Sequence, residues 1–372
     1  MPKLLSFSNT AWYLHNYRVP VDRLLRARGW EIVMASPDGK FRDQIRAAGF
    51  RWHEVPMSRS GVNPLEDLQT AKCLAELIRS ERPDVLHAFT MKGNINGSLA
   101  ARLAGLPAIV NSIAGLGFVF SSDRALARVL RGPARVAYRA ALARGQVIFQ
   151  NGEDLEAFAA QGMASRDQST LIRSSGVDVG AFRPTPEPAG RVRVLYAARL
   201  LWTKGIGELV EAARLLRARG VDFELLIAGD PDIGNPATVS SGDLDNWEAE
   251  GVIERLGFCS DMASLMQTCH VVCFPSKHKE GTPRFLIEAA ACGLPIVTTR
   301  NRGCTEVVEH EVNGLLVGVG SVPELAAALE RLIGNAELRS EYGQRGREIA
   351  VRDFSVMQVA DRTEAVYRRL LA

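Results

Sequence analysis

Short apolar runs alternate with helix-like segments along almost the whole chain. In the first half, the runs that predict strands are Leu4–Phe7, Glu31–Ala35, Asp84–Phe89, Ala108–Ser112, Gln146–Gln150 and Thr170–Arg173. In the second half, they are Val192–Ala197, Phe223–Ala228, Val271–Phe274, Ile296–Thr298 and Leu315–Val317. Segments with helical periodicity separate them, among them Val21–Arg28, Pro64–Ser80 and Gly97–Ala104. This alternation predicts parallel sheets covered by helices on both faces.

One segment, Gly176–Gly190, breaks the alternation; it is rich in Pro and Gly and predicts a linker. A chain of 372 residues is long for one compact domain and natural for two. We therefore expect an α/β protein with two doubly wound, Rossmann-like domains, residues 1–175 and 191–354, that face each other across a cleft. Residues 355–372 predict a C-terminal helix, for which packing back on the N-terminal domain is one of two options.

The net charge of +3 conceals an asymmetry between the two halves. Residues 1–175 carry 23 Lys and Arg against 15 Asp and Glu, whereas the remainder carries 22 against 27. A basic N-terminal half favours an anionic partner, such as a phosphate-bearing substrate or an acidic lipid surface. We expect no nucleic-acid partner, because the chain has no nucleic-acid motif and no aromatic-rich basic stretch.

The sequence shows no pattern typical of a membrane span or of a signal peptide. No apolar run approaches the roughly 20 residues that cross a bilayer, and the start of the chain lacks the apolar core of a signal peptide. We therefore expect a cytoplasmic protein, which can still associate with the inner face of the cell membrane.

The cysteines show no CxxC pair and no zinc-like spacing to histidine, so they predict small core residues and no metal site. They are Cys73, Cys259, Cys269, Cys273, Cys292 and Cys304.

The densest chemical signal is the stretch KEGTPRFLIEA, in which Thr282 and Pro283 suit the N-cap and the first position of a helix. The free N–H groups of such a helix start attract an anion. Glu280 precedes the helix and can accept hydrogen bonds from sugar hydroxyls, whereas Glu288 lies within it and can hold a ribose diol. Either glutamate alone is typical of a solvated surface, but the whole string favours a site. The residues expected to bind this ligand, which carries an anion and a sugar, are Gly281, Thr282, Pro283, Arg284 and Glu288.

A second signal follows the strand predicted at 192–197, where Arg199 and Lys204 precede Gly205 and a helix. Cations at the carboxyl end of a parallel strand suit a diphosphate. Arg199 can grip phosphate oxygens with its forked guanidinium, and Lys204 supplies a compact charge for the leaving group. Alone, such a pair is typical of surface charges, so its weight comes from the combination with Glu280.

Together, these two elements resemble family 4 of the retaining glycosyltransferases, which have the two-domain GT-B fold. Glu280 and Glu288 match the family's two glutamates separated by seven residues, and Arg199 and Lys204 match its R-x4-K phosphate pair. The resemblance covers essentially the whole chain. The catalytic residues that it implies are Arg199, Lys204 and Glu280.

The resemblance implies a nucleotide-diphosphate sugar donor, expected to be UDP-linked, and transfer of a hexose or N-acetylhexosamine with retention of configuration. It implies no cofactor and no metal, because the cationic pair and the helix start neutralise the leaving diphosphate. Such stabilisation of charge in the transition state is usually the largest catalytic term. The matching stretches include Ala228–Asp230 and Ser174–Asp178, and Arg173 beside the latter joins the expected donor-binding residues. Glu280 is expected to position the sugar rather than to attack it.

One position departs from the family pattern. Many members carry a histidine after the strand that corresponds to Ala108–Ser112, and here the aligned residue is Ala114. His15 and His87 lie near predicted strand ends, and a structural role is the favoured interpretation for each. The acceptor-side base therefore stays unassigned.

The first domain is expected to bind the acceptor through the loops that follow its strands. Asn16 and Arg18 follow the first strand, and Lys92 and Asn96 follow the strand that ends at Phe89. Amide and cationic groups at strand ends suit the recognition of sugars and phosphates.

An arginine-rich stretch lies between residues 122 and 145. Its arginines recur every three or four residues and form one helical stripe: Arg124, Arg128, Arg131, Arg135 and Arg139. Gly132-Pro133 is expected to kink or divide this helix. Beside the apolar run Phe118–Phe120, the stripe suits an anionic membrane surface, and an ordinary solvated face explains it equally well. Within the family, this stretch and the preceding Gly-Leu-Gly-Phe run look like members that extend polyprenyl-diphosphate-linked sugars, which implies a lipid-linked saccharide acceptor in surface polysaccharide or glycan assembly.

Two other functions stay open at this point. A nucleotide-sugar epimerase of the same fold class also needs a diphosphate site, but it has no use for a membrane-facing basic helix. A non-catalytic nucleotide-sugar-binding protein would keep the donor site and lack a competent acceptor side. A Rossmann dehydrogenase is disfavoured because no GxGxxG follows the first strand. An insertion at residues 231–247 has no assigned role.

Overall fold

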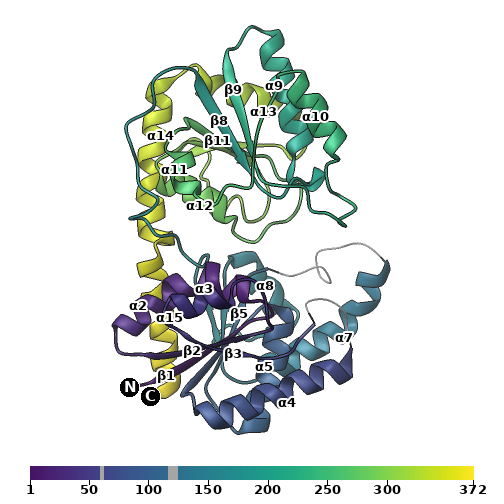
Figure 1. Cartoon of the computed structure of the whole chain (residues 1–372), viewed down its shortest axis with the longest axis vertical. Helices are drawn as coiled ribbons and strands as arrows, with labels where there is room; N and C mark the ends of the chain where they lie inside the picture. Colours follow the sequence, from purple (N-terminus) through teal and green to yellow (C-terminus); the bar gives the residue numbers. More distant parts are fainter. Residues whose placement is uncertain (59–62, 116–124) are drawn as a thin grey trace. The chain divides into compact units, whose positions relative to one another are not determined.

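A computed structural model describes residues 1–58, 63–115 and 125–372 of the chain. The chain divides into two compact units (Figure 1): Met1–Gly176 and Val356–Ala372 form the first, and Val177–Ser355 forms the second. Each unit contains a parallel sheet with helices around it, so the predicted α/β class with two doubly wound domains is confirmed. Within the described ranges, no helix has both the length and the apolar character of a membrane span.

The first unit is built on seven parallel strands in the order β3-β2-β1-β4-β5-β6-β7. The strands are β1 (Lys3–Phe7), β2 (Glu31–Ser36), β3 (Arg51–Glu54), β4 (Val85–Phe89), β5 (Ile109–Ile113), β6 (Gln146–Phe149) and β7 (Ser169–Leu171). Every residue of β4 and β5 is buried, as expected for central strands covered on both faces. The strand order reverses between β1 and β4, and ligands of doubly wound sheets bind at the carboxyl ends beside such a reversal.

Among the described residues of the first unit, the helices are α1 (Ala11–Tyr13), a π-helix (Leu14–Arg18), α2 (Val19–Ala27), α3 (Arg42–Ala47), α4 (Pro64–Glu81), α5 (Met91–Ala104), α7 (Ala125–Leu142), α8 (Gly152–Ala160) and α15 (Val356–Leu371). The C-terminal helix α15 packs on α2. Its Glu364 accepts hydrogen bonds from Arg28 at 2.9 Å and from the indole N–H of Trp30 at 3.2 Å. The end of the chain is therefore part of the first unit's core.

The second unit has six parallel strands in the order β10-β9-β8-β11-β12-β13, which reverses between β8 and β11. The strands are β8 (Val192–Ala197), β9 (Phe223–Ala228), β10 (Glu254–Gly257), β11 (Val271–Phe274), β12 (Ile296–Thr299) and β13 (Gly314–Val317). Its helices are a 3₁₀ turn (Trp202–Lys204), α9 (Ile206–Ala218), α10 (Ser241–Ala249), α11 (Met262–Met266), α12 (Arg284–Ala291), α13 (Val322–Ile333), α14 (Ala336–Ile349) and a π-helix (Ala350–Phe354).

The segment expected to be a linker packs on the second unit from Val177 onward. The guanidinium of Arg347 in α14 donates to the carbonyl oxygens of Phe182 at 2.8 Å and Val179 at 2.9 Å. These charge-assisted hydrogen bonds hold the segment against the helix. Pro and Gly content therefore identified an irregular segment, but side-chain contacts give it a defined place.

The pattern of apolar runs missed the two strands β3 and β10. Each lies at the edge of its sheet, and each contains exposed or half-buried residues instead of an apolar run. An edge strand is covered less completely than a central one, so its sequence can stay polar.

Helix α5 begins at Met91, six residues earlier than predicted, because Thr90 caps it by accepting from the N–H of Gly93. Pro133 does not divide the helix, because α7 continues through it. Tyr138 and Leu142 are fully buried, and this packing outweighs the low helix propensity of proline.

Candidate functional site

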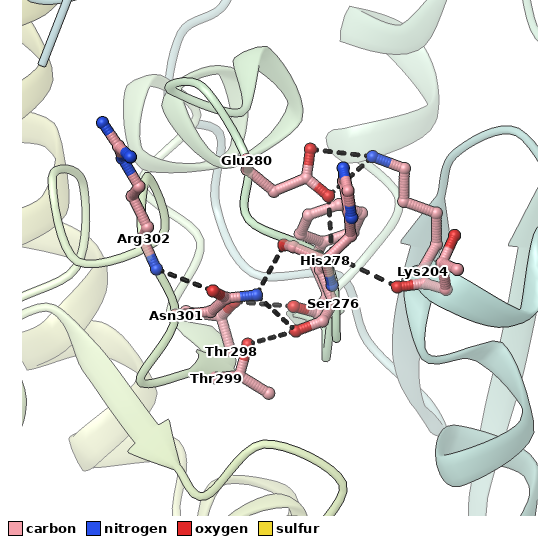
Figure 2. Close-up of polar contacts among 10 residues, drawn as sticks. Lys204, Ser276, His278, Glu280, Thr298, Thr299, Asn301 and Arg302 are labelled. Carbon is pink, nitrogen blue, oxygen red and sulfur yellow. Dashed lines mark hydrogen bonds and ion pairs between the residues drawn. The ribbon is translucent and has the colours of Figure 1, made fainter. Parts of the chain in front are cut away.

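Lys204 and Glu280 meet where the strand order of the second sheet reverses. Lys204 follows β8, Glu280 follows β11, and the lysine Nζ lies 2.6 Å from Oε1 and 2.8 Å from Oε2 of the carboxylate (Figure 2). The two side chains are only 16% and 13% exposed. Two of the three predicted catalytic residues therefore lie together at the edge where such sheets bind ligands.

A glycine makes the position of Lys204 possible. The 3₁₀ turn that ends at Lys204 is followed by Gly205, whose φ is +80°. A Cβ atom there would lie 1.9 Å from the carbonyl oxygen of Pro275, so the loop after β8 packs backbone to backbone on the loop after β11. Only glycine allows both this φ and this approach.

Two residues that the sequence analysis did not single out support Glu280. The Ser276 hydroxyl donates to Oε1 of Glu280 at 2.6 Å. The Asn301 amide donates to the carbonyl oxygens of Ser276 at 3.1 Å and His278 at 2.5 Å, which fixes the loop that carries Glu280 (Figure 2). Both residues follow the carboxyl ends of neighbouring strands, β11 and β12. That position is the signal that could have found them.

The Lys204–Glu280 pair brings two opposite charges together at this edge. The carboxylate of Glu280 accepts from both Lys204 and Ser276, so its charge is well compensated. Because the pair is largely shielded from water, its charges interact more strongly than on an open surface. A diphosphate brought to this edge would compete with Glu280 for the ammonium group and leave the carboxylate hydrogen-bonded to Ser276.

Arg199, the third predicted catalytic residue, is mostly exposed and pairs with Asp232 at 2.6 Å. Asp232 lies in the 231–247 insertion, which packs along the loop after β8. The backbone N–H of Trp202 donates to Ala237 O at 2.8 Å, and that of Val239 donates to Leu200 O at 2.9 Å. The insertion therefore supports the segment that carries Arg199 and Lys204.

Glu288 lies on α12, where the guanidinium of Arg284 donates to its Oε1 at 2.7 Å. Burial raises the pKa of the Glu288 carboxyl, and the charge and hydrogen bond of Arg284 oppose this rise. The helix begins at Arg284, one residue later than predicted, because Pro283 has an extended ψ of 117° and takes the N-cap position. Thr282 therefore precedes the cap, and Gly281 lies in the loop before it.

In the first unit, two of the predicted acceptor-binding residues are buried. Arg18 is 3% exposed, and its guanidinium donates to Asp22 at 2.6 Å while lying 4.8 Å from the ring centroid of Phe89. Asn96 is 1% exposed and donates to Asp67 at 3.2 Å. Both were expected on loops, whereas each lies in a helix, and their role in acceptor binding stays a prediction.

The other first-unit residues stay closer to solvent. Lys92, in the first turn of α5, contacts Asp67 at 3.2 Å and the Ser58 hydroxyl at 2.9 Å. The Asn16 amide donates to the carbonyl oxygen of Trp12 at 2.9 Å. Arg173, expected to bind the donor, follows β7 in this unit and is half-buried.

Both histidines near predicted strand ends have structural surroundings. His87 is buried, with Nδ1 2.5 Å from the Tyr367 hydroxyl and Nε2 2.7 Å from the Ser112 hydroxyl. Burial and then the charge of Arg18 lower the pKa of His87 well below its usual value, so the ring is neutral. His15 is half-buried, and burial followed by the charge of Arg23 lowers its pKa. Ala114 is half-buried after β5 and offers no base.

The structure describes only part of the predicted arginine stripe. Arg124, the side chain of Arg128 and the run Phe118–Phe120 lie outside the described residues. Arg135 and Arg139 are exposed on α7, and Arg135 donates to the Gln161 side chain at 2.9 Å. Over the described ranges, no cluster of three His, Cys, Asp or Glu side chains is placed to hold a metal ion.

Two family models match the chain in the same order as its two units. Residues 3–151 match the model described as "Glycosyl transferase 4-like", and residues 181–349 match the model "Glycosyl transferases group 1". The chain belongs to the family 4 glycosyltransferases. The first match lies within the first unit, and the second spans the loops that carry Lys204, Glu280 and Glu288.

Curated relatives and solved structures agree with this assignment. An N,N'-diacetylbacillosaminyl-diphospho-undecaprenol alpha-1,3-N-acetylgalactosaminyltransferase from Campylobacter jejuni is 26% identical to this glycosyltransferase over 96% of both chains. A UDP-Gal:alpha-D-GlcNAc-diphosphoundecaprenol alpha-1,3-galactosyltransferase from Escherichia coli is 24% identical over 84% of this chain and 82% of its own. The crystal structure of Anabaena HepE in complex with UDP has the same fold, with a TM-score of 0.81, 20% identity, and coverage of 99% of this chain and 100% of that one.

Proposed function

We propose that this glycosyltransferase moves a hexose or an N-acetylhexosamine from a UDP-linked donor to a polyprenyl-diphosphate-linked saccharide, with retention of configuration. The observation that carries the donor half is the Lys204–Glu280 pair at the reversal of the second sheet. A cation and a hydrogen-bonded carboxylate are adjacent there, and the transfer needs both a diphosphate contact and a sugar contact.

In this proposal, Lys204 and Arg199 neutralise the diphosphate as the bond between its oxygen and the anomeric carbon breaks. Stabilising charge that develops in the transition state accounts for much of the rate enhancement of many enzymes. Glu280 accepts hydrogen bonds from sugar hydroxyls and positions the ring, while Glu288 holds the ribose. We propose that no metal ion is required, so transfer should persist in EDTA.

The acceptor half rests on the relatives and on charge. The Campylobacter and Escherichia enzymes are named for sugars joined to undecaprenol through a diphosphate. Residues 1–175 carry an excess of Lys and Arg, which suits a lipid-bound diphosphate at an anionic surface. We therefore place the protein at the inner face of the cell membrane, in the assembly of surface polysaccharides or glycans.

The proposal is tested with a panel of UDP-hexoses and UDP-N-acetylhexosamines and with undecaprenyl-diphosphate N-acetylhexosamine in detergent. We expect acceptor-dependent release of UDP from one donor, and a product whose new linkage has the donor's anomeric configuration by NMR. Conversion of the donor without acceptor would instead indicate an epimerase. Donor binding with no turnover on any acceptor would indicate a non-catalytic binding protein, and inversion would contradict the retaining mechanism.

A further inference from the structure

Trp12 is the most exposed of the five tryptophans, with 48% of its surface accessible, whereas Trp30, Trp52 and Trp247 are buried. Tryptophan combines a large apolar face with a polar N–H group, and for that reason it is enriched where proteins contact other molecules. We propose that the indole of Trp12 is a stacking surface for the acceptor saccharide. This inference rests on the proposed function and names the residue and the contact that would recognise the sugar.

The ring is held in place by a series of aromatic contacts that reaches the core. Trp12 meets Tyr17 edge-on at 5.3 Å between ring centroids, Tyr17 lies 5.0 Å from Tyr13, and Tyr13 lies 5.5 Å from Phe89. Phe89 is buried at the end of β4, with the Arg18 guanidinium on its face. An indole fixed in this way loses little side-chain entropy when a ligand covers it.

At the carboxyl ends of β1 and β4, the backbone has two features that often occur at functional sites. The chain from Leu14 to Arg18 is a π-helix, a rare form that is enriched at such sites. Thr90, at the end of β4, has φ 70° and ψ 162°, a region that is essentially restricted to glycine. Both follow the carboxyl ends of β1 and β4, the strands between which the order of the first sheet reverses. A ligand of this unit is expected at that edge.

The chemistry near Trp12 suits a sugar better than a lipid tail. The negative face of an indole attracts the C–H bonds on one face of a pyranose, and polar neighbours can serve the hydroxyls. Asn16 contacts the Trp12 backbone, and Thr10 caps the turn that carries Trp12. A membrane-inserting surface would need several adjacent apolar side chains, whereas the residues before this turn, Asn9 and Thr10, are polar.

Kinetics on Trp12→Ala, Trp12→Leu and Trp12→Phe test the inference, with undecaprenyl-diphosphate N-acetylhexosamine in detergent as acceptor. We expect Trp12→Ala and Trp12→Leu to raise the acceptor KM about tenfold or more and to leave the donor KM unchanged. Trp12→Phe keeps an aromatic face and should stay within about threefold of wild type. Leu65→Ala, at another exposed apolar residue of this unit, is the matched control and should change neither constant.

Fluorescence separates this inference from the proposed function. Titration with a water-soluble, short-chain prenyl-diphosphate N-acetylhexosamine, without donor, should change the tryptophan emission of wild type but not that of Trp12→Phe. If wild type transfers sugar while Trp12→Ala keeps its acceptor KM, the inference is wrong and the proposed function stands. If no sugar is transferred but the titration still produces the Trp12-dependent change in fluorescence, the stacking site is supported and the proposed function is wrong. Reduced sedimentation of Trp12→Ala with anionic liposomes, together with an unchanged acceptor KM, would overturn the inference in favour of a membrane contact.

Discussion

The ammonium group of Lys204 lies 2.6 Å from the carboxylate of Glu280, although 76 positions separate the two residues in the sequence. Parallel strands make this approach possible, because β8 and β11 are neighbours and their carboxyl ends point to the same edge. Each residue holds the other in place, and Ser276 holds the carboxylate from another direction. The ammonium and carboxylate groups are therefore held at fixed positions beside each other.

Lys204→Ala should lower kcat by about 10²- to 10³-fold, the loss found when one group that stabilises transition-state charge is removed. Circular dichroism should show an intact fold, although the variant loses some stability because the largely shielded Glu280 loses its partner. Lys277→Ala is the matched control, since Lys277 is an exposed lysine of the Glu280 loop that pairs with Glu208. Full activity of Lys204→Ala would refute the assignment of the donor site.

Glu288→Gln should become more stable relative to wild type as the pH rises. Burial raises the folded-state pKa of Glu288 above its ordinary value of 4.5, so the native state binds its proton more tightly than the unfolded state does. That contribution is fully present below pH 4.5 and is lost as the pH rises through the folded-state pKa. Glutamine does not titrate and escapes this loss. Urea unfolding of both proteins across this pH range measures their unfolding free energies, and a Glu288→Gln variant that loses stability relative to wild type as the pH rises would contradict the prediction.

Gly205→Ala should be much more harmful than Gly220→Ala. Both glycines have φ +80°, so alanine costs roughly 1–2 kcal/mol at either position. A Cβ at Gly220 meets nothing within 4 Å, whereas one at Gly205 would lie 1.9 Å from Pro275 O. Any further decrease in the free energy of unfolding of Gly205→Ala therefore measures this clash. The displaced loop should also impair catalysis, because it carries Lys204. Equal midpoints of denaturation for the two variants would show that the loops separate easily.

Reversing Arg131, Arg135 and Arg139 to glutamate should reduce sedimentation with liposomes that contain anionic lipid. Each cation near such a surface contributes about 1 kcal/mol, and the effect should fade at high salt. Reversal of three exposed arginines in the second unit, Arg219, Arg345 and Arg352, changes the net charge equally and is the control. Equal loss in both triple variants would indicate a general charge effect and no membrane role for α7.

Local sequence determined the class of fold and most of its central strands. Buried parallel strands must be apolar on both faces, so runs such as Val271–Phe274 and Phe223–Ala228 were found with their observed bounds. Edge strands are under no such constraint, which is why Arg51–Glu54 and Glu254–Gly257 gave no signal. The R-x4-K and two-glutamate spacings, matched through the family resemblance, likewise pointed to Lys204 and Glu280, and both residues follow strands at the edge where such sheets bind ligands.

Only the tertiary structure decided which of these groups meet. No spacing reveals that Lys204 and Glu280 form a pair, that Ser276 joins them, or that Asp232 holds Arg199. These contacts depend on which strands become neighbours. Burial is a property of the whole fold as well, and only the fold shows that the charged Arg18 is 3% exposed. The sequence by itself therefore determined which chemical groups follow these strands, and packing determined their partners and their exposure.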